Sequence, residues 1–171
     1  MLSKNKIDKR YTKGCYRSRK RLAGISWETP IEGAVKFNVD AAVNGVVGSA
    51  GIGGVLKDHT GKTLLCFSKY IGFSDPTSAE LQGILEACCC FVGSQWVGTK
   101  SLIIESDSKI AVNWIKRPLS VPASFKDLVG KCREYIDRFK WDIAFVFRER
   151  NAVAHRLAKE GLQKLLNAVG K

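Results

Sequence analysis

The chain has 171 residues, of which 45% are hydrophobic, and this is enough for one domain with a buried core that needs no stapling by disulfides or metals. Its formal net charge of +12, with a pI of about 9.6, favours an anionic partner. No apolar run approaches the roughly 18–20 residues that a membrane-spanning helix needs, so the composition excludes a transmembrane protein.

The positive charge is concentrated at the start of the chain. Residues 1–21 contain nine lysine and arginine side chains against Asp8, a charge of +8, so the other 150 residues carry only +4. We predict that residues 1–26 form a basic flexible arm or linker and that residues 27–171 form the folded domain. Such runs serve as solvated tails, nuclear-targeting signals or nucleic-acid contacts. The arm lacks the apolar segment of a secretory signal, so we expect an intracellular protein, with a nuclear location among the open possibilities.

The first half of the domain predicts three strands joined by short turns. Residues 35–40 alternate apolar and polar side chains, and Asn44-Gly45 marks a turn. Residues 51–56 form a second strand, whose glycines would let another backbone or a ligand approach closely. No Gly-Lys-Ser/Thr follows these glycines, so a phosphate-binding loop is disfavoured. A third strand over residues 62–70 completes an antiparallel meander.

The second half alternates helical and strand patterns. The expected helices cover residues 78–93, 108–115, 125–139 and 151–169, and the expected strands cover residues 102–106 and 141–147. The two later strands follow helices, so they can add to the sheet in parallel by crossovers. We therefore predict an α/β fold with a mixed five-stranded sheet, three strands antiparallel and two added in parallel, flanked by helices.

Six cysteines are present, three of them consecutive at residues 88–90. Neighbouring residues on a helix point in different directions, so these three cannot form a mutual set of disulfides. The absence of a C-x-x-C pair disfavours a zinc site, and buried free thiols in a reducing compartment are the preferred interpretation.

Four polar residues lie in otherwise apolar segments. Asp40 ends the first strand, Glu80 lies in the first turn of the first helix, Asp107 follows the fourth strand, and His155 lies on the last helix. Each has a plain structural explanation, as a turn residue, a partner of the helix dipole, a helix cap and a core histidine respectively. On the same plain interpretation, Glu105 faces solvent.

Taken together, these residues suggest a metal site. Crossovers gather strand ends and neighbouring helix termini at one edge of an open sheet, where ligands bind. Three carboxylates meeting there would repel one another unless cations lay among them. Magnesium and manganese prefer such hard oxygen ligands. Two such ions about 3.5–4 Å apart can activate a water and stabilise the leaving oxygen of a phosphodiester.

The segments that carry these residues are KFNVDAA, TSAELQGILEA, LIIESDSKIAVNWI and RERNAVAHRLAKEGL. In this order and spacing they resemble ribonuclease H. More narrowly, they resemble the plant ribonuclease-H-like domains that occur alone and at the ends of non-LTR (LINE-type) retroelement polyproteins. The resemblance extends from about Trp27 to Leu162.

The resemblance implies a metal-dependent endonuclease that hydrolyses the RNA strand of RNA–DNA hybrids with two Mg²⁺ ions, for which Mn²⁺ can substitute. The implied catalytic and metal-binding residues are Asp40, Glu80, Asp107 and His155, and the implied substrate-backbone contacts are Asn44, Thr77, Ser78 and Ser108. Glu80 would also lie close to the 2′-hydroxyl that distinguishes RNA from DNA. We expect the basic arm to contact nucleic acid, and nothing indicates an obligate dimer, so we expect a monomer.

The sequence departs from the family pattern in several places. Ala41 replaces the usual glycine after the first aspartate, and His155 occupies the fourth acidic position. A neutral imidazole can bind a divalent ion but adds no charge and favours softer metals than magnesium. We therefore predict retained but weakened activity, with better support from manganese. Residues 147–151 are too few to hold the histidine-bearing loop of the family, and this absence resembles the archaeal-like subtype. Residues 108–140 contain no basic protrusion.

Other interpretations stay open at this point. His155 and Ala41 also suit a nucleic-acid-binding module that keeps the fold and has lost the chemistry. A small-molecule phosphatase or nucleotide-binding protein is a third possibility. Arg148 and Arg150 bracket the expected active edge, where they serve either as phosphate contacts or as partners of Glu149.

Overall fold

The computed structural model describes residues 27–169, so the predicted basic arm over residues 1–26 lies outside the described residues. The strands are β1 (Ala34–Val43), β2 (Gly48–Lys57), β3 (Thr63–Ser74), β4 (Ser101–Ser106) and β5 (Asp142–Phe145). The helices are α1 (Pro76–Val92), α2 (Lys109–Lys116), α3 (Lys126–Phe139) and α4 (Ala152–Val169), with short 3-10 turns η2 (Pro118–Ser120), η3 (Ala123–Phe125) and η4 (Arg148–Arg150).

The five strands form one mixed sheet in the order β3-β2-β1-β4-β5. β1 pairs antiparallel with β2, and β2 pairs antiparallel with β3. β4 adds in parallel beside β1, and β5 adds in parallel beside β4. This topology confirms the predicted sheet of three antiparallel strands and two parallel additions.

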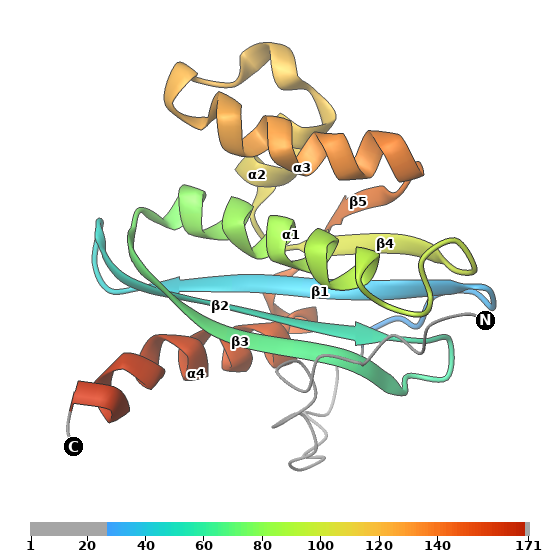
Figure 1. Ribbon diagram of the computed structural model, residues 1–171, viewed down its shortest axis with the longest axis horizontal. Helices are drawn as coiled ribbons and strands as arrows, with labels where there is room; N and C mark the ends of the chain where they lie inside the picture. The colour runs from blue at the N-terminus through green and yellow to red at the C-terminus, as the bar shows by residue number, and fades with distance from the viewer. Residues whose placement is uncertain (1–26, 170–171) are drawn as a thin grey trace, which may run out of the picture.

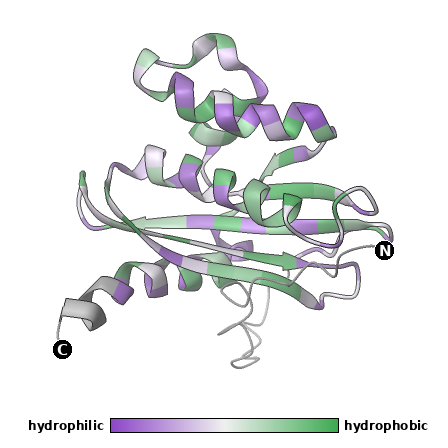
Figure 2. Cartoon of the chain, viewed as in Figure 1, coloured by the Kyte–Doolittle hydropathy of each residue, from purple (hydrophilic) through white to green (hydrophobic). Residues whose placement is uncertain are grey.

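The helices cover both faces of the sheet (Figure 1). α1 lies on one face with α2 and α3 beyond it, and α4 lies on the opposite face beneath β1, β2 and β3. The main core fills the space between α1 and the sheet, where Phe37, Leu81, Ile84 and Ile104 have no exposed surface. The strands are largely hydrophobic in colour, whereas α3 carries hydrophilic segments at the surface (Figure 2). None of the helices within residues 27–169 is long and apolar enough to cross a membrane.

Several strand boundaries differ from the expectation, and β2 and β3 extend beyond the predicted residues 51–56 and 62–70. The differences at β1 and β5 follow from pairing. β1 continues past Asp40 to Val43 because its antiparallel pairing with β2 extends to Ala50. Asp40 is therefore inside β1 rather than at its end, although the parallel pairing of β1 with β4 stops one residue earlier, at Val39. β5 is shorter than predicted because its partner β4 ends at Ser106.

The cysteines within residues 27–169 form no disulfide. Cys66, Cys88, Cys90 and Cys132 are buried and Cys89 is exposed. Burial raises the pKa of the Cys88 thiol above its ordinary value, so this thiol stays protonated and acts as a small apolar group.

The glycines of β2 bring α4 close to the sheet. A Cβ added at Gly51 or Gly53 would fall within 3.0 Å of α4 backbone atoms, including those of Ala158 and Leu162. Gly161 of α4 approaches the β3 backbone at Lys69 in the same way. The glycines of β2 therefore make room for the backbone of α4. Of the two possibilities that the sequence left open, another backbone or a ligand, the structure shows the backbone.

We expect Gly53→Ala to lower the free energy of unfolding by about 1–3 kcal/mol, because the added methyl group must displace the α4 backbone. Gly130→Ala is the matched control: a Cβ there meets nothing within 4 Å and the residue lies inside α3. This control should raise the stability by about 0.5–1 kcal/mol. Urea denaturation measures both values, and equal effects of the two substitutions would contradict the close packing of α4 on β2.

Candidate functional site

Three carboxylates that are distant in sequence meet at the end of β4. Asp40, Glu80 and Asp107 each offer an oxygen atom, and these three atoms all lie within 4.8 Å of one another. Asp40 comes from the middle of β1, Glu80 from α1, and Asp107 from the bend that follows β4. The predicted convergence of these three residues is present in the structure.

The local folding of the chain directs each carboxylate into this group. β4 ends at Ser106, and Ser108 rather than Asp107 caps α2, because its Oγ accepts a hydrogen bond from Ala111 N at 3.2 Å. Asp107 therefore keeps its carboxylate free of the capping role. Glu80 lies in the second turn of α1 rather than the first, because Asp75 caps this helix and Pro76 begins it.

Crowding and burial shape the protonation of the group. Burial, followed by repulsion from Asp40 and Asp107, raises the pKa of Glu80 well above its ordinary value. Burial and the neighbouring Asp40 also raise the pKa of Asp107, and Arg148 partly opposes this rise. Glu80 Oε2 is buried and has no hydrogen-bond partner within the described residues. Ionisation of all three carboxylates is therefore costly in free energy unless a further positive group binds among them.

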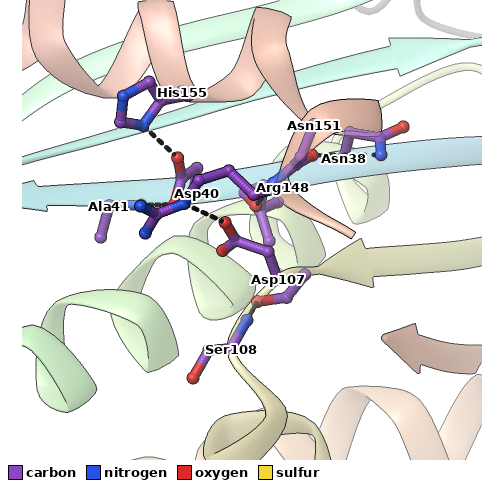
Figure 3. A network of polar contacts seen from close by, with 10 residues as sticks. Asn38, Asp40, Ala41, Asp107, Ser108, Arg148, Asn151 and His155 are labelled. Atoms are coloured by element: carbon purple, nitrogen blue, oxygen red, sulfur yellow. Dashed lines mark hydrogen bonds and ion pairs between the residues drawn. The ribbon is translucent and has the colours of Figure 1, made fainter. Parts of the chain in front are cut away.

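Two nitrogen-bearing side chains flank Asp40 and Asp107, as Figure 3 shows. His155 Nδ1, from the first turn of α4, lies 2.7 Å from Asp40 Oδ2. Arg148 Nε lies 3.4 Å from Asp107 Oδ2, and the Arg148 side chain remains 77% exposed. Arg148 thus contacts Asp107 rather than Glu149, and Arg150 pairs with Glu28 at 2.9 Å.

The donor set suits a hard divalent cation. All three members of the group are carboxylates, and the unpartnered oxygen of Glu80 is the kind of atom that a bound ion would satisfy. Magnesium and manganese both prefer such oxygen donors. His155 lies outside the group of three and contacts it through Asp40.

The four predicted substrate contacts lie on three different elements. Asn44 is exposed in the β1–β2 turn, where its N–H donates to the Ser49 carbonyl at 3.0 Å. Thr77 and Ser78 lie in the first turn of α1, and Ser108 caps α2. None of the four belongs to the carboxylate group, although Ser108 directly follows Asp107.

A buried polar network beside the carboxylates was not predicted. Glu105 is 8% exposed, so the expectation that it faces solvent is wrong. Its carboxylate pairs with Lys36 Nζ at 2.9 Å and accepts a hydrogen bond from Asn38 Nδ2 at 2.9 Å. Asn38 also donates to Asn151 Oδ1 at 3.2 Å. The alternation of polar residues 36, 38 and 40 along one face of β1 was the available signal for this network.

Comparisons with known proteins agree with this geometry. A family model described as "Reverse transcriptase-like" matches residues 38–161. A curated Arabidopsis thaliana protein that carries the name of a ribonuclease H protein is 34% identical over an alignment of 139 residues that covers 78% of this chain. The alignment covers 21% of that protein, so the chain spans about a fifth of the curated relative's length.

Solved structures share the fold. LC11-RNase H1, isolated from compost by a metagenomic approach, matches with a TM-score of 0.73 and 25% identity, over 78% of this chain and 99% of that one. A structure of LC11-RNase H1 in complex with an RNA/DNA hybrid matches with a TM-score of 0.71 and 24% identity, over 77% of this chain and 99% of that one.

We expect Glu80→Gln to stabilise the metal-free protein, by an amount that grows as the pH rises. The raised pKa of Glu80 means that the folded state holds a proton that the unfolded state releases above the ordinary value of 4.5. Stability from this group is therefore present at low pH and is lost as the pH rises toward the raised pKa. Glutamine is uncharged at every pH and avoids this loss.

Urea denaturation in a chelator at pH 5 and pH 8 measures the effect. Glu134→Gln, a change of an exposed carboxylate on α3, serves as the control and should shift stability little at either pH. A Glu80→Gln difference that stays constant between the two pH values would contradict the described crowding of carboxylates.

Proposed function

The chain belongs to the ribonuclease H family, as its reverse transcriptase-like match shows, and from this premise we propose that it is a metal-dependent endonuclease that hydrolyses the RNA strand of RNA–DNA hybrids. The observation that carries the proposal is the group of three carboxylates within 4.8 Å, with one buried oxygen left unpartnered. The hybrid complex of LC11-RNase H1, a protein of the same fold, supports the choice of substrate.

In this proposal Asp40, Glu80 and Asp107 hold two Mg²⁺ ions, for which Mn²⁺ can substitute. Such ions, when bound, supply an activated water and stabilise the leaving oxygen of the phosphodiester. The three side chains set where the cations bind, and their combined negative charge makes binding strongly favourable. Glu80 is also the proposed neighbour of the substrate's 2′-hydroxyl.

His155 takes the fourth position of the site through its contact with Asp40. With Asp40 ionised, a proton on His155 Nδ1 is donated to Oδ2 and holds that carboxylate in one orientation. The imidazole adds no negative charge when neutral, so it attracts cations less than a carboxylate would. This difference is the basis for proposing weakened activity and better support by manganese.

Arg148 is the proposed contact for a substrate phosphate. Its side chain lies beside the carboxylate group and is mostly exposed, so its guanidinium can turn from Asp107 toward an incoming anion. Substrate-backbone contacts are also proposed for exposed or half-buried residues at the ends of neighbouring elements, namely Asn44, Thr77, Ser78 and Ser108.

We expect the protein to cleave a labelled RNA–DNA hybrid in Mg²⁺ or Mn²⁺. We expect Asp40→Asn to lower the cleavage rate by more than ~100-fold, because mutating a residue that only supports a metal ligand already costs up to about that factor. Asp127→Asn is the matched control, because Asp127 is an exposed carboxylate on α3. Binding of the hybrid without cleavage in either metal would instead support a binding module that has lost its chemistry. An absence of both binding and cleavage would reject the nucleic-acid substrate.

His155 gives a second, independent prediction. We expect His155→Ala to lower kcat by about 10–100-fold, because Asp40 then loses the group that orients it. His155→Asp should raise the ratio of Mg²⁺-supported to Mn²⁺-supported kcat, because it adds a hard, charged oxygen donor. Steady-state cleavage assays in each metal measure both effects, and unchanged kinetics in the alanine variant would show that the imidazole has no role.

A further inference from the structure

A buried polar network crosses three elements beneath the carboxylates. Lys36 Nζ on β1 lies 2.9 Å from Glu105 Oε1 on β4, and it also donates to the Glu28 carbonyl at 2.9 Å. The second oxygen of Glu105 accepts from Asn38 Nδ2 at 2.9 Å. Both oxygens of this buried carboxylate are therefore used, and its charge is balanced within the network.

Asn38 links this ion pair to α4. Its amide nitrogen has two hydrogens, and both are used, one toward Glu105 and one toward Asn151 Oδ1 at 3.2 Å. Asn151 is 1% exposed and donates in turn to the Val39 carbonyl at 2.9 Å. Its own carbonyl accepts from His155 N at 3.0 Å, within the first turn of α4.

Asn38 and Glu105 of this network each lie two residues before a member of the carboxylate group. Asn38 and Glu105 face each other across the parallel β1–β4 pair. Asn38 precedes Asp40 by two residues, so the two side chains project from the same face of β1. Glu105 likewise precedes Asp107 by two residues. Any shift of β4 or α4 relative to β1 would therefore move the contact partners of Asp40.

We propose that Asn38 and Glu105 are positioning residues, which hold β4 and the start of α4 in fixed register across β1 and thereby set the contact between His155 and Asp40. The proposal rests on the proposed nuclease function only for its effect on the reaction. Neither side chain contacts the reacting atoms. Asn38 affects the position of His155 through its hydrogen bond to Asn151, and Glu105 affects the position of Asp107 through β4.

The chemistry of the pair favours this role over simple packing. A carboxylate and an amide are costly to bury, and an apolar pair of similar size would fill the same space. Hydrogen bonds, unlike apolar contacts, are directional and fix one relative placement of the three elements. The network reaches the start of α4 beside the carboxylate group, where the placement of α4 sets the distance between His155 and Asp40.

The first test reads the position of His155 directly. The chain has two histidines, so a protein labelled with ¹³C-histidine gives two imidazole Cε1–H signals, from His155 and from the exposed His59. At fixed pH and without added metal, we expect Asn38→Ala and Glu105→Ala to shift the His155 signal and to leave the His59 signal in place. Glu105→Gln keeps an oxygen that can accept from Asn38, so its His155 signal should stay near that of the wild type.

The second test compares kinetics. The two alanine variants should lower kcat for hybrid cleavage roughly tenfold with little change in KM, and Glu105→Gln should restore most of the loss. Glu86→Ala is the matched control, because it removes a carboxylate of α1 that pairs with Lys69 of β3, outside the network. This control should leave the His155 signal and kcat unchanged.

The outcomes separate the two proposals. A His155 signal that does not move in the folded alanine variants would overturn the positioning role. So would loss of the fold in both of them, because the pair would then be a requirement for folding. If the wild type cleaves no hybrid but the His155 signal shifts as expected, the nuclease function fails and the positioning role stands.

Discussion

The mutual repulsion of three carboxylates withdrawn from bulk water is the constraint on which the rest of this structure depends. Asp40, Glu80 and Asp107 place oxygen atoms within 4.8 Å of one another, and burial, followed by repulsion between these groups, raises the pKa values of Glu80 and Asp107. Without a bound cation, Arg148 and the protonation of Glu80 offset part of this repulsion. A fold tolerates such a cost where the charge serves a function, and a divalent cation is the partner that matches these oxygen donors.

The scaffold holds this unfavourable group through its central strand. α1 and α4 lie on opposite faces of the sheet (Figure 1), and these helices carry Glu80 and His155 respectively. His155 contacts Asp40 (Figure 3), and the chain that follows β4 brings Asp107 close to the same carboxylate. The close approach of α4 depends on Gly51 and Gly53 of β2, which leave no side chain between helix and sheet. Residues with no chemistry of their own thus determine where the imidazole lies.

Much of the fold follows from periodicity, because amphipathic helices and alternating strands leave clear patterns in this chain. The convergence of the carboxylates was also predictable, since crossovers bring strand ends to one edge. The burial of Glu105 was not, because its partners Lys36 and Asn38 lie on another strand some 67 residues away and a single sequence carries no pairing register. Likewise, the extension of β1 beyond Asp40 depends on its pairing with β2, which the local pattern around residue 40 does not contain.

Anomalous diffraction from crystals soaked in Mn²⁺ tests the central claim most directly, because it locates the cation without reference to activity. Strong anomalous peaks within coordinating distance of the three carboxylates, reduced or lost in a crystal of the Asp107→Asn variant, are the result that this account predicts. Carboxylates that keep the described arrangement in saturating manganese, with no anomalous signal among them, would contradict it.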